Sequence, residues 1–261
     1  MKKILICGSE YRHAAYAFNL HKTIKLDGII IEQKRHQVDD NHLTPIIIEY
    51  LSERDKEEFK NFGKYSFGDI STNKFFVSNG SVNSSEVLNW ISEINPHVIL
   101  LYGCSIIGKT LISLYEGRIV NLHLGLSPYY KGAATLFWPI VFNEIQCIGS
   151  TFHIASDKVD AGPILQQIRP HFSNDETIHS SGCKVMIESF ALAPLVIDKY
   201  LNNKIKLISQ NQIPDSRVFK KTDFNETSVL IASDNISKGA FKTFYSSKED
   251  LIQKYPIVNS L

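Results

Sequence analysis

The stretch Gly117–Gln167 decides the fold, and it reads GRIVNLHLGLSPYYKGAATLFWPIVFNEIQCIGSTFHIASDKVDAGPILQQ. It opens with a short apolar run after a glycine, which is the pattern of a buried strand. Asn121 and His123 end this run, and because strand side chains alternate faces, both should point the same way. Ligands of parallel α/β sheets bind at the carboxyl ends of the strands. We therefore expect Asn121 and His123 to line a ligand site.

The rest of the stretch predicts a shaped turn and two more strands. The turn holds residues that cannot continue a helix, namely Gly125, Ser127, Pro128 and Gly132. A second apolar strand runs from about Cys147 to Ile154 and leads to a polar loop with Asp157 and Asp160. Gly162 and Pro163 then turn the chain into a third strand, Ile164–Ile168. The stretch thus offers an amide, an imidazole and a carboxylate near the ends of strands.

These three groups together can run acyl transfer to an amine. An amide donates hydrogen bonds to the oxyanion that develops on the attacked carbonyl. An imidazole donates to the same oxyanion or moves a proton. A carboxylate takes the proton from the attacking amine, so no covalent nucleophile is required.

At this point the residues resemble the formyltransferase family. The shared motifs are Asn-x-His, a Ser-Pro turn, Tyr-Lys-Gly, Gly-Ser-Thr-x-His and Val-Asp-Ala-Gly-Pro-Ile, densest between Pro96 and Gln167. The family includes glycinamide ribonucleotide, methionyl-tRNA and sugar-nucleotide formyltransferases. The resemblance implies that Asn121, His123 and Asp160 are catalytic and that 10-formyltetrahydrofolate is the formyl donor. Many members have Ser-Leu-Leu-Pro where this chain has Gly125-Leu126-Ser127-Pro128, a departure that bears on subtype more than on chemistry.

The resemblance also implies where the folate binds. In the family, the loop after the strand equivalent to His97–Tyr102 wraps the pterin with main-chain groups, and apolar side chains cover the faces of the ring. A second loop of this chain, Asp157-Lys158-Val159, faces the same cofactor. The predicted folate contacts from the first loop are Ser105, Ile106, Ile107 and Leu111, with Ile112 beside them. For Leu111 and Ile112, plain core packing is the favoured interpretation.

Two further segments are candidates for the acceptor substrate. A strand at Lys3–Cys7, a small-residue turn and a helix over Tyr11–Lys25 form a Rossmann-like unit that can present N–H groups to a phosphate. Gly8, Ser9, Arg12 and His13 are therefore predicted to contact a diphosphate, with a solvated helix start as the alternative. The Gly-rich phosphate loop of the purine-pathway member is missing. After the catalytic turn come the candidates Tyr129, Lys131 and Trp138, although a solvated lysine is also possible. The Phe137-Trp138-Pro139 run resembles the sugar-nucleotide branch.

The whole chain is predicted to be an α/β protein, a Rossmann-like and mostly parallel sheet with helices on both faces. Residues 1–209 are predicted to form the catalytic domain, and 210–261 a small appended element that is expected to be β-rich and to act as a lid or a subunit contact. Further strands are expected at Leu26–Glu32, Phe75–Val77, His97–Tyr102 and Ile205–Ser209. Helices are expected at Pro45–Phe62, Ser84–Ile94, Thr135–Ile145 and Glu176–Leu201, the last capped by Asn174 or Asp175.

Composition excludes several classes of function. The chain has 261 residues, 43% hydrophobic, and a formal net charge of +1, so nothing indicates general binding to nucleic acid or anionic membranes. We expect no signal peptide and no apolar run long enough to span a membrane, and hence a cytoplasmic protein. Four scattered cysteines indicate reduced thiols: Cys7, Cys104, Cys147 and Cys183.

No metal site is predicted. His123, His153, Asp157 and Asp160 lack the close pairing that metal ligands usually show. For His153, a hydrogen-bonded core residue is the favoured interpretation, and a partner of the catalytic groups is the alternative.

The sequence therefore favours N-formylation of the primary amine of a nucleotide-linked amino sugar, by resemblance for a surface polysaccharide such as lipopolysaccharide O-antigen. Formylation of methionyl-tRNA or glycinamide ribonucleotide, folate hydrolysis, and a non-catalytic folate- or nucleotide-binding module remain alternatives. The expected partner is the nucleotide sugar, with no nucleic acid and no membrane, and a homodimer is possible.

Overall fold

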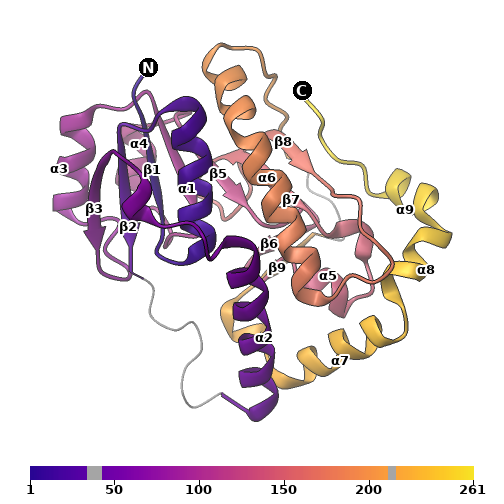
Figure 1. Cartoon of the computed structure of the whole chain (residues 1–261). Helices are drawn as coiled ribbons and strands as arrows, with labels where there is room; N and C mark the ends of the chain where they lie inside the picture. Colours follow the sequence, from indigo (N-terminus) through magenta and orange to yellow (C-terminus); the bar gives the residue numbers. More distant parts are fainter. Residues whose placement is uncertain (34–42, 211–215) are drawn as a thin grey trace.

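A seven-stranded sheet forms the centre of the computed structural model, which describes residues 1–33, 43–210 and 216–261. The strand order is β3-β2-β1-β4-β5-β7-β8 (Figure 1). Five neighbouring strands are parallel: β1 (Lys3–Gly8), β2 (Gly28–Glu32), β3 (Asn73–Val77), β4 (Val98–Tyr102) and β5 (Ile119–His123). The other two, β7 (Ser150–Ile154) and β8 (Ile164–Ile168), join as an antiparallel extension. The mostly parallel α/β fold predicted from the sequence is confirmed.

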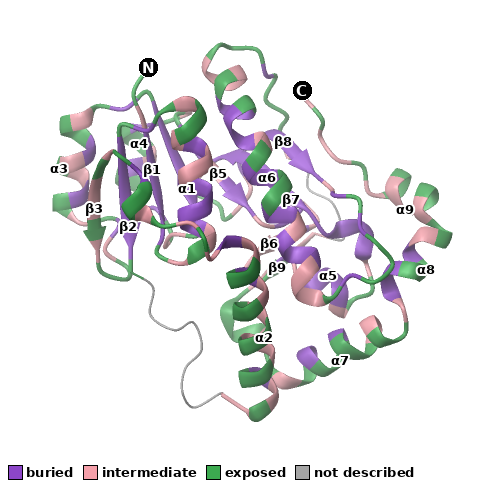
Figure 2. Cartoon of the chain, in the orientation of Figure 1, coloured by how far each residue is buried: buried purple, intermediate pink, exposed green. Residues whose placement is uncertain are grey.

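Helices cover both faces of this sheet (Figure 1). Along β1, Leu5 and Cys7 pack into one apolar cluster, while Ile4 and Ile6 pack into another on the opposite face. The first cluster includes residues of α1 (Tyr11–Ile24), α6 (Ile178–Leu201) and the end of α2 (Pro45–Phe62). The second includes α3 (Ser85–Ile94) and α4 (Lys109–Leu114). Because both faces are covered, the central strands are buried and mostly apolar, with polar residues at the ends of β2 and β5 (Figure 2).

The longest helix, α6, begins at Ile178 and not at Glu176. Its cap is Thr177, whose side chain accepts from the Ser180 N–H while the Ser180 hydroxyl accepts from the Thr177 N–H. The prediction of Asn174 or Asp175 as the cap was therefore wrong, because this reciprocal capping box satisfies the helix start further along the chain.

By length and composition, α6 is also apolar enough to cross a membrane, which the sequence analysis did not expect of any segment. Of its most apolar window, 61% is buried inside the protein. A buried core helix meets the same compositional criterion, and the packing of α6 on the sheet is of that kind.

The segment after residue 215 is mostly helical. It contains α7 (Glu226–Ser237), α8 (Ala240–Ser246) and α9 (Lys248–Lys254), together with the 3₁₀ turn η4 (Lys221–Asp223). Its one described strand, β9 (Arg217–Phe219), pairs in parallel with β6 (Tyr130–Gly132). The β-rich expectation was wrong here because α7 has both a capping box, Asn225 with Ser228, and apolar residues at helical spacing. These apolar residues pack into a third apolar cluster, which includes Tyr130, Phe137, Trp138, Phe172 and Phe241.

Other differences from the sequence prediction are local. The expected helix Thr135–Ile145 is reduced to α5 (Trp138–Val141) and the 3₁₀ turn η3 (Ile145–Cys147), because Ala134 and Asn143 adopt left-handed backbone angles, with φ of 56° and 53°. The strand after η3 accordingly starts at Ser150. The expected strand Ile205–Ser209 contributes only a single bridge between Ile208 and Ile164. A further 3₁₀ turn, η2, spans Phe67–Asp69.

Substitution of Phe190 in α6 tests how much the packing of α6 on the sheet contributes to stability. Its ring is 2% exposed and contacts the rings of Tyr16, Phe62 and Tyr102. Phe190→Ala should lower the free energy of unfolding by about 3–5 kcal/mol, because it leaves a cavity in the core. The control is Ile187→Ala on the solvent side of the same helix, where Ile187 is 46% exposed and the expected loss is about 1 kcal/mol or less. Urea unfolding measures both, and similar losses would contradict this assignment of the core.

Candidate active site

Four polar side chains meet beside β5. Asn121 and His123 come from β5 itself, and His153 lies directly opposite Asn121 on β7. Asp160 comes from the loop that joins β7 to β8. The side chains are largely buried, with exposures of 6% for His123 and 3% for His153. The sequence prediction that Asn121 and His123 share a face matches this arrangement, and the structure also brings Asp160 to them.

The Asp160 carboxylate is the centre of the group. Its Oδ2 accepts a hydrogen bond from the Gly132 N–H at 2.9 Å and lies 3.3 Å from His123 Nδ1. Its Oδ1 lies 3.4 Å from His153 Nε2 and 3.4 Å from Asn121 Nδ2. The side chain is 12% exposed, so a molecule approaching from solvent can still reach it.

The backbone at Asp160 is held in an uncommon conformation. Its φ is +47°, in the left-handed region that aspartate tolerates better than most residues. The Gln210 side-chain amide donates to the carbonyls of Asp160 (2.9 Å) and Gly162 (2.7 Å), which fastens this loop. The conformation therefore aims the carboxylate at β5.

The ring of His123 is fixed from two sides. Its Nε2 lies 3.1 Å from the Tyr130 carbonyl, so this nitrogen carries the proton and donates, which leaves Nδ1 facing Asp160. A Cβ on Gly125 would lie 2.4 Å from Nε2, so only glycine leaves room for the ring. The turn after β5 thus sets both the position and the tautomer of His123.

His153 orients the amide of Asn121. Its Nδ1 lies 2.9 Å from the Ile154 carbonyl and donates there, so the Nε2 lone pair accepts from Asn121 Nδ2 at 3.0 Å. A hydrogen-bonded core residue was the favoured interpretation of His153, and its burial and its bond to Ile154 agree with that. The structure supports the alternative too, since His153 is buried and also contacts Asn121 and Asp160. The available signal was its place on a strand that pairs with the Asn-x-His strand.

Burial and charge set the protonation of this group. Burial lowers the pKa of His123, although the Asp160 carboxylate opposes the shift. Burial alone would raise the pKa of Asp160, but His123, His153 and the Gly132 N–H outweigh it and hold that pKa below its ordinary value. At neutral pH the site therefore contains an ionised Asp160 beside an uncharged His123. His123 Nδ1 and Asp160 Oδ2, 3.3 Å apart, are therefore placed to share one proton.

Two residues that the sequence analysis did not single out hold the predicted folate loop. Glu32, at the end of β2 and fully buried, accepts from the Ser105 N–H (2.7 Å) and the Ser105 hydroxyl (2.5 Å). Asn83 accepts from the Gly108 N–H (2.6 Å) and donates to the Ile106 carbonyl (2.9 Å). An acidic residue directly after an apolar strand was the signal for Glu32; Asn83 has no comparable local signal.

The predicted folate contacts divide by exposure. Ile106 is 78% exposed, and Asp157, Lys158 and Val159 are exposed on the second loop. Ile107 and Leu111 are buried in the apolar cluster of α3 and α4. Folate binding by these residues stays a prediction, and the exposed set has the surface available for it.

Arg12 and His13, predicted to contact a diphosphate, have close partners within the chain. Arg12 Nη1 lies 2.6 Å from both carboxylate oxygens of Glu58, and Nη2 pairs with Glu10. His13 is 1% exposed, and its ring packs against Gly8 and Gly103, where any Cβ would collide with it. Ser9, which follows Gly8 in the chain, is exposed. Their role toward a diphosphate stays a prediction, but the guanidinium charge is already neutralised.

The candidates after the catalytic turn also differ in what they contact. The Tyr129 hydroxyl donates to the Pro256 carbonyl at 2.9 Å. Trp138 is 5% exposed, stacks on Phe219 at 4.5 Å and donates to the Ala133 carbonyl, so it packs in the core of the third cluster. Lys131 is half-buried and makes no ion pair with the described residues.

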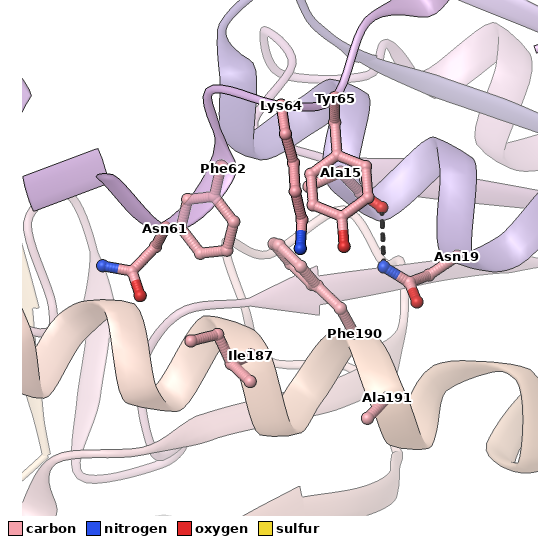
Figure 3. Close-up of a pocket in the computed structure, with 9 residues that line it drawn as sticks. All are labelled: Ala15, Asn19, Asn61, Phe62, Lys64, Tyr65, Ile187, Phe190 and Ala191. Atoms are coloured by element: carbon pink, nitrogen blue, oxygen red, sulfur yellow. Dashed lines mark hydrogen bonds between the residues drawn. The ribbon is translucent and has the colours of Figure 1, made fainter. Parts of the chain in front are cut away.

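A separate cavity of about 250 Å³ lies between α1, the end of α2 and α6. Figure 3 shows the rings of Phe62, Tyr65 and Phe190 around it, with the Lys64 amine among them. None of its nine lining residues belongs to the predicted site. Across the described ranges, no group of three or more His, Cys, Asp or Glu side chains is arranged to hold a metal ion.

Comparison with known proteins identifies the family. The family described as Formyl transferase matches residues 33–195. The chain belongs to the formyl transferase family. Phosphoribosylglycinamide formyltransferase of Escherichia coli is 29% identical over 47% of this chain and 58% of its own length. A methionyl-tRNA formyltransferase of Clostridium acetobutylicum is 28% identical over 66% of this chain and 57% of its own. The chain thus spans little more than half the length of these relatives.

Solved structures of this formyl transferase family share the fold. A phosphoribosylglycinamide formyltransferase of Anaplasma phagocytophilum has a TM-score of 0.58 at 17% identity, covering 84% of this chain and 97% of its own. An N-formyltransferase of Helicobacter canadensis, solved with folinic acid and dTDP-3-aminofucose, has a TM-score of 0.56 at 18% identity over 86% and 73%. Likenesses of this degree show the fold and leave the acceptor open.

The coupling between Asp160 and His123 in this formyl transferase can be measured by NMR titration of the histidine rings. Asp160→Asn removes the negative charge that opposes the burial effect, so the pKa of His123 should fall further below its ordinary value. His179 on α6, where burial lowers the pKa to about 4, is the internal control and should titrate identically in both proteins. A rise in the pKa of His123 would contradict the assigned geometry.

Proposed function

We propose that this chain transfers a formyl group from 10-formyltetrahydrofolate to the primary amine of a nucleotide-linked amino sugar. The observation that carries the proposal is the convergence of an amide, an imidazole and an ionised carboxylate: Asn121, His123 and Asp160. A formyl transfer to an amine needs these three functions and no intermediate covalently bound to the protein. Family membership supports formyl transfer, and the named ligands of the Helicobacter canadensis structure support this pair of substrates.

In this mechanism the amine nitrogen attacks the formyl carbon and the carbonyl becomes an oxyanion. Asn121 Nδ2 donates to that oxyanion, exchanging its 3.4 Å contact with Asp160 for a charged partner. The ammonium proton released by the attack passes to Asp160, where His123 Nδ1 shares it. Once protonated at Nδ1, His123 carries a positive charge that stabilises the oxyanion electrostatically. The bond between the formyl carbon and N10 of the folate then breaks, N10 takes up the proton held between Asp160 and His123, and tetrahydrofolate leaves.

The amino-sugar acceptor is favoured over tRNA by charge. Residues 216–261 contain seven Lys and Arg against five Asp and Glu, and the whole chain has a net charge of +1. Binding to tRNA relies on basic surfaces that neutralise several phosphates. Glycinamide ribonucleotide stays the second candidate acceptor, because the Escherichia coli relative with that name is among the matches.

Lys131 is the proposed contact to the diphosphate of the acceptor. It precedes Gly132, whose N–H holds Asp160, so the Lys131 backbone lies beside the reacting centre. Arg12, by contrast, lies between Glu10 and Glu58 and brings no net positive charge to its corner of the sheet. The charge balance therefore favours Lys131 over Arg12 for this role.

Loss of any of the three catalytic groups should lower turnover by orders of magnitude. For Asn121→Ala, His123→Ala and Asp160→Asn we expect kcat to fall at least about 10²-fold, the typical effect of removing one oxyanion donor. Tetrahydrofolate release, followed by absorbance, measures the rate, and mass spectrometry of the product identifies the acceptor. Near-normal turnover in all three variants would remove the mechanism.

A panel of acceptors separates the candidate functions. A nucleotide sugar heavier by one formyl group confirms the proposal, and formylated glycinamide ribonucleotide or methionyl-tRNA would replace it with that activity. Folate release with no acceptor present would identify a hydrolase. Folate binding without turnover of any acceptor would favour the non-catalytic module.

Lys131→Ala should raise KM for the nucleotide sugar about tenfold and change kcat less, since a ground-state contact to a diphosphate is lost. Lys64→Ala, which removes an exposed lysine at the separate cavity, is the matched control and should leave KM unchanged. Equal KM values for the two variants would exclude Lys131 from diphosphate binding.

A further inference from the structure

The last residues of the chain run beside the edge strand of the sheet. After α9, the C-terminal segment turns back past β8 (Figure 1), and the Gln167 N–H donates to the Val258 carbonyl at 2.9 Å. Side chains add to this contact: the Arg169 guanidinium donates to the Tyr255 carbonyl at 2.5 Å, and the Tyr129 hydroxyl donates to the Pro256 carbonyl. Residues 256–260, called here the C-terminal strap, therefore cover the free edge of β8.

Gln167 connects the strap to the interior. Its Oε1 accepts from the Val258 N–H at 2.9 Å, and its Nε2 donates to the Ser127 carbonyl at 2.6 Å and to the Thr151 hydroxyl at 3.0 Å. The side chain is 3% exposed. A buried amide with all these bonds formed is costly to disturb, because removing it leaves buried donors and acceptors without partners.

The groups that Gln167 holds belong to the turn that positions the catalytic residues. The Thr151 hydroxyl accepts from the Ser127 N–H (3.0 Å) and donates to the Gly125 carbonyl (2.7 Å). Gln167 and Thr151 together therefore fasten both Gly125 and Ser127, directly after His123. The same turn continues to Tyr130, which receives the His123 hydrogen bond, and to Gly132, which donates to Asp160.

We propose that Gln167 is a positioning residue for formyl transfer, and that the C-terminal strap acts through it to hold the catalytic turn in place. The strap contacts Gln167, Gln167 contacts Ser127 and Thr151, and the turn then sets the tautomer of His123 and the direction of Asp160. Measuring this role by turnover rests on the proposed function, whereas measuring it by amide hydrogen exchange does not.

The neighbouring Gln166 provides a matched control within the same strand. It is 4% exposed and bonds the strap as well: its Oε1 accepts from the Ser260 N–H (2.7 Å), and its Nε2 donates to Asn259 Oδ1 (3.2 Å). Its remaining bond goes to the Gln167 carbonyl and not to the catalytic turn. Gln166→Leu therefore removes buried amide bonds to the strap without touching Ser127 or Thr151.

The experiment compares Gln167→Leu with Gln166→Leu by amide hydrogen exchange and by turnover. In Gln167→Leu, exchange at the Ser127 and Gly132 amides should accelerate at least about tenfold, and kcat should fall about 10- to 100-fold with KM changed less, as expected for a small displacement of catalytic groups. In Gln166→Leu, exchange at these two amides and kcat should stay within about threefold of the wild type. Equal effects of the two variants on both readouts would overturn the proposal.

Val258→Pro tests the strap with Gln167 left intact, since proline has no N–H to donate. It should also accelerate exchange at the Ser127 amide. The double variant Gln167→Leu/Val258→Pro should exchange no faster at Ser127 than Gln167→Leu alone, because both changes remove the same hydrogen bond between Val258 and Gln167. Additive effects, or unchanged exchange in Val258→Pro, would contradict the role of the strap. Exchange needs no substrate, so a failed acceptor assay with altered exchange would count against the proposed function and not against the positioning role.

Discussion

The Asp160 carboxylate is the interaction on which the rest of the site depends. A buried carboxylate is stable only when its charge is met by hydrogen bonds and compensating groups. Here these come from separate elements: β5 supplies Asn121 and His123, β7 supplies His153, and the turn before α5 supplies the Gly132 N–H. Each of these elements must be correctly placed for the carboxylate to make all of these contacts. The site and the antiparallel end of the sheet are therefore formed together.

The C-terminal segment also supports the turn that holds Asp160, through contacts made by β9. β9 pairs with β6, and Arg217 bridges to Glu144 and to the Tyr130 hydroxyl. Phe219 stacks between Trp138 and Tyr130 in the third apolar cluster. The turn that bears Tyr130 and Gly132 is thus packed against residues from the last fifth of the chain. Those residues support the reacting groups without supplying any of them.

Charge is distributed unevenly around the carboxyl ends of the strands. Near β1 and β2, Arg12 pairs with both Glu10 and Glu58, and the buried Glu32 accepts from the Ser105 N–H. In many nucleotide-binding folds the first helix start meets a phosphate; here Glu10 and Arg12 already occupy that corner. Lys131 lies on the other side of the site, next to the turn that binds Asp160. The difference explains why a phosphate contact by the first helix is less favoured than the strand-turn-helix pattern indicates.

The sequence by itself determined the features that rest on local periodicity. Apolar runs marked the central strands, the helix over Pro45–Phe62 was predicted at its observed bounds, and the two-residue spacing put Asn121 and His123 on one face. Only the tertiary structure decided which distant groups meet: His153 with Asn121, Glu58 with Arg12, and Gln167 with both Ser127 and Val258. These outcomes depend on contacts between residues tens of positions apart, and no local pattern specifies which buried polar groups will satisfy one another.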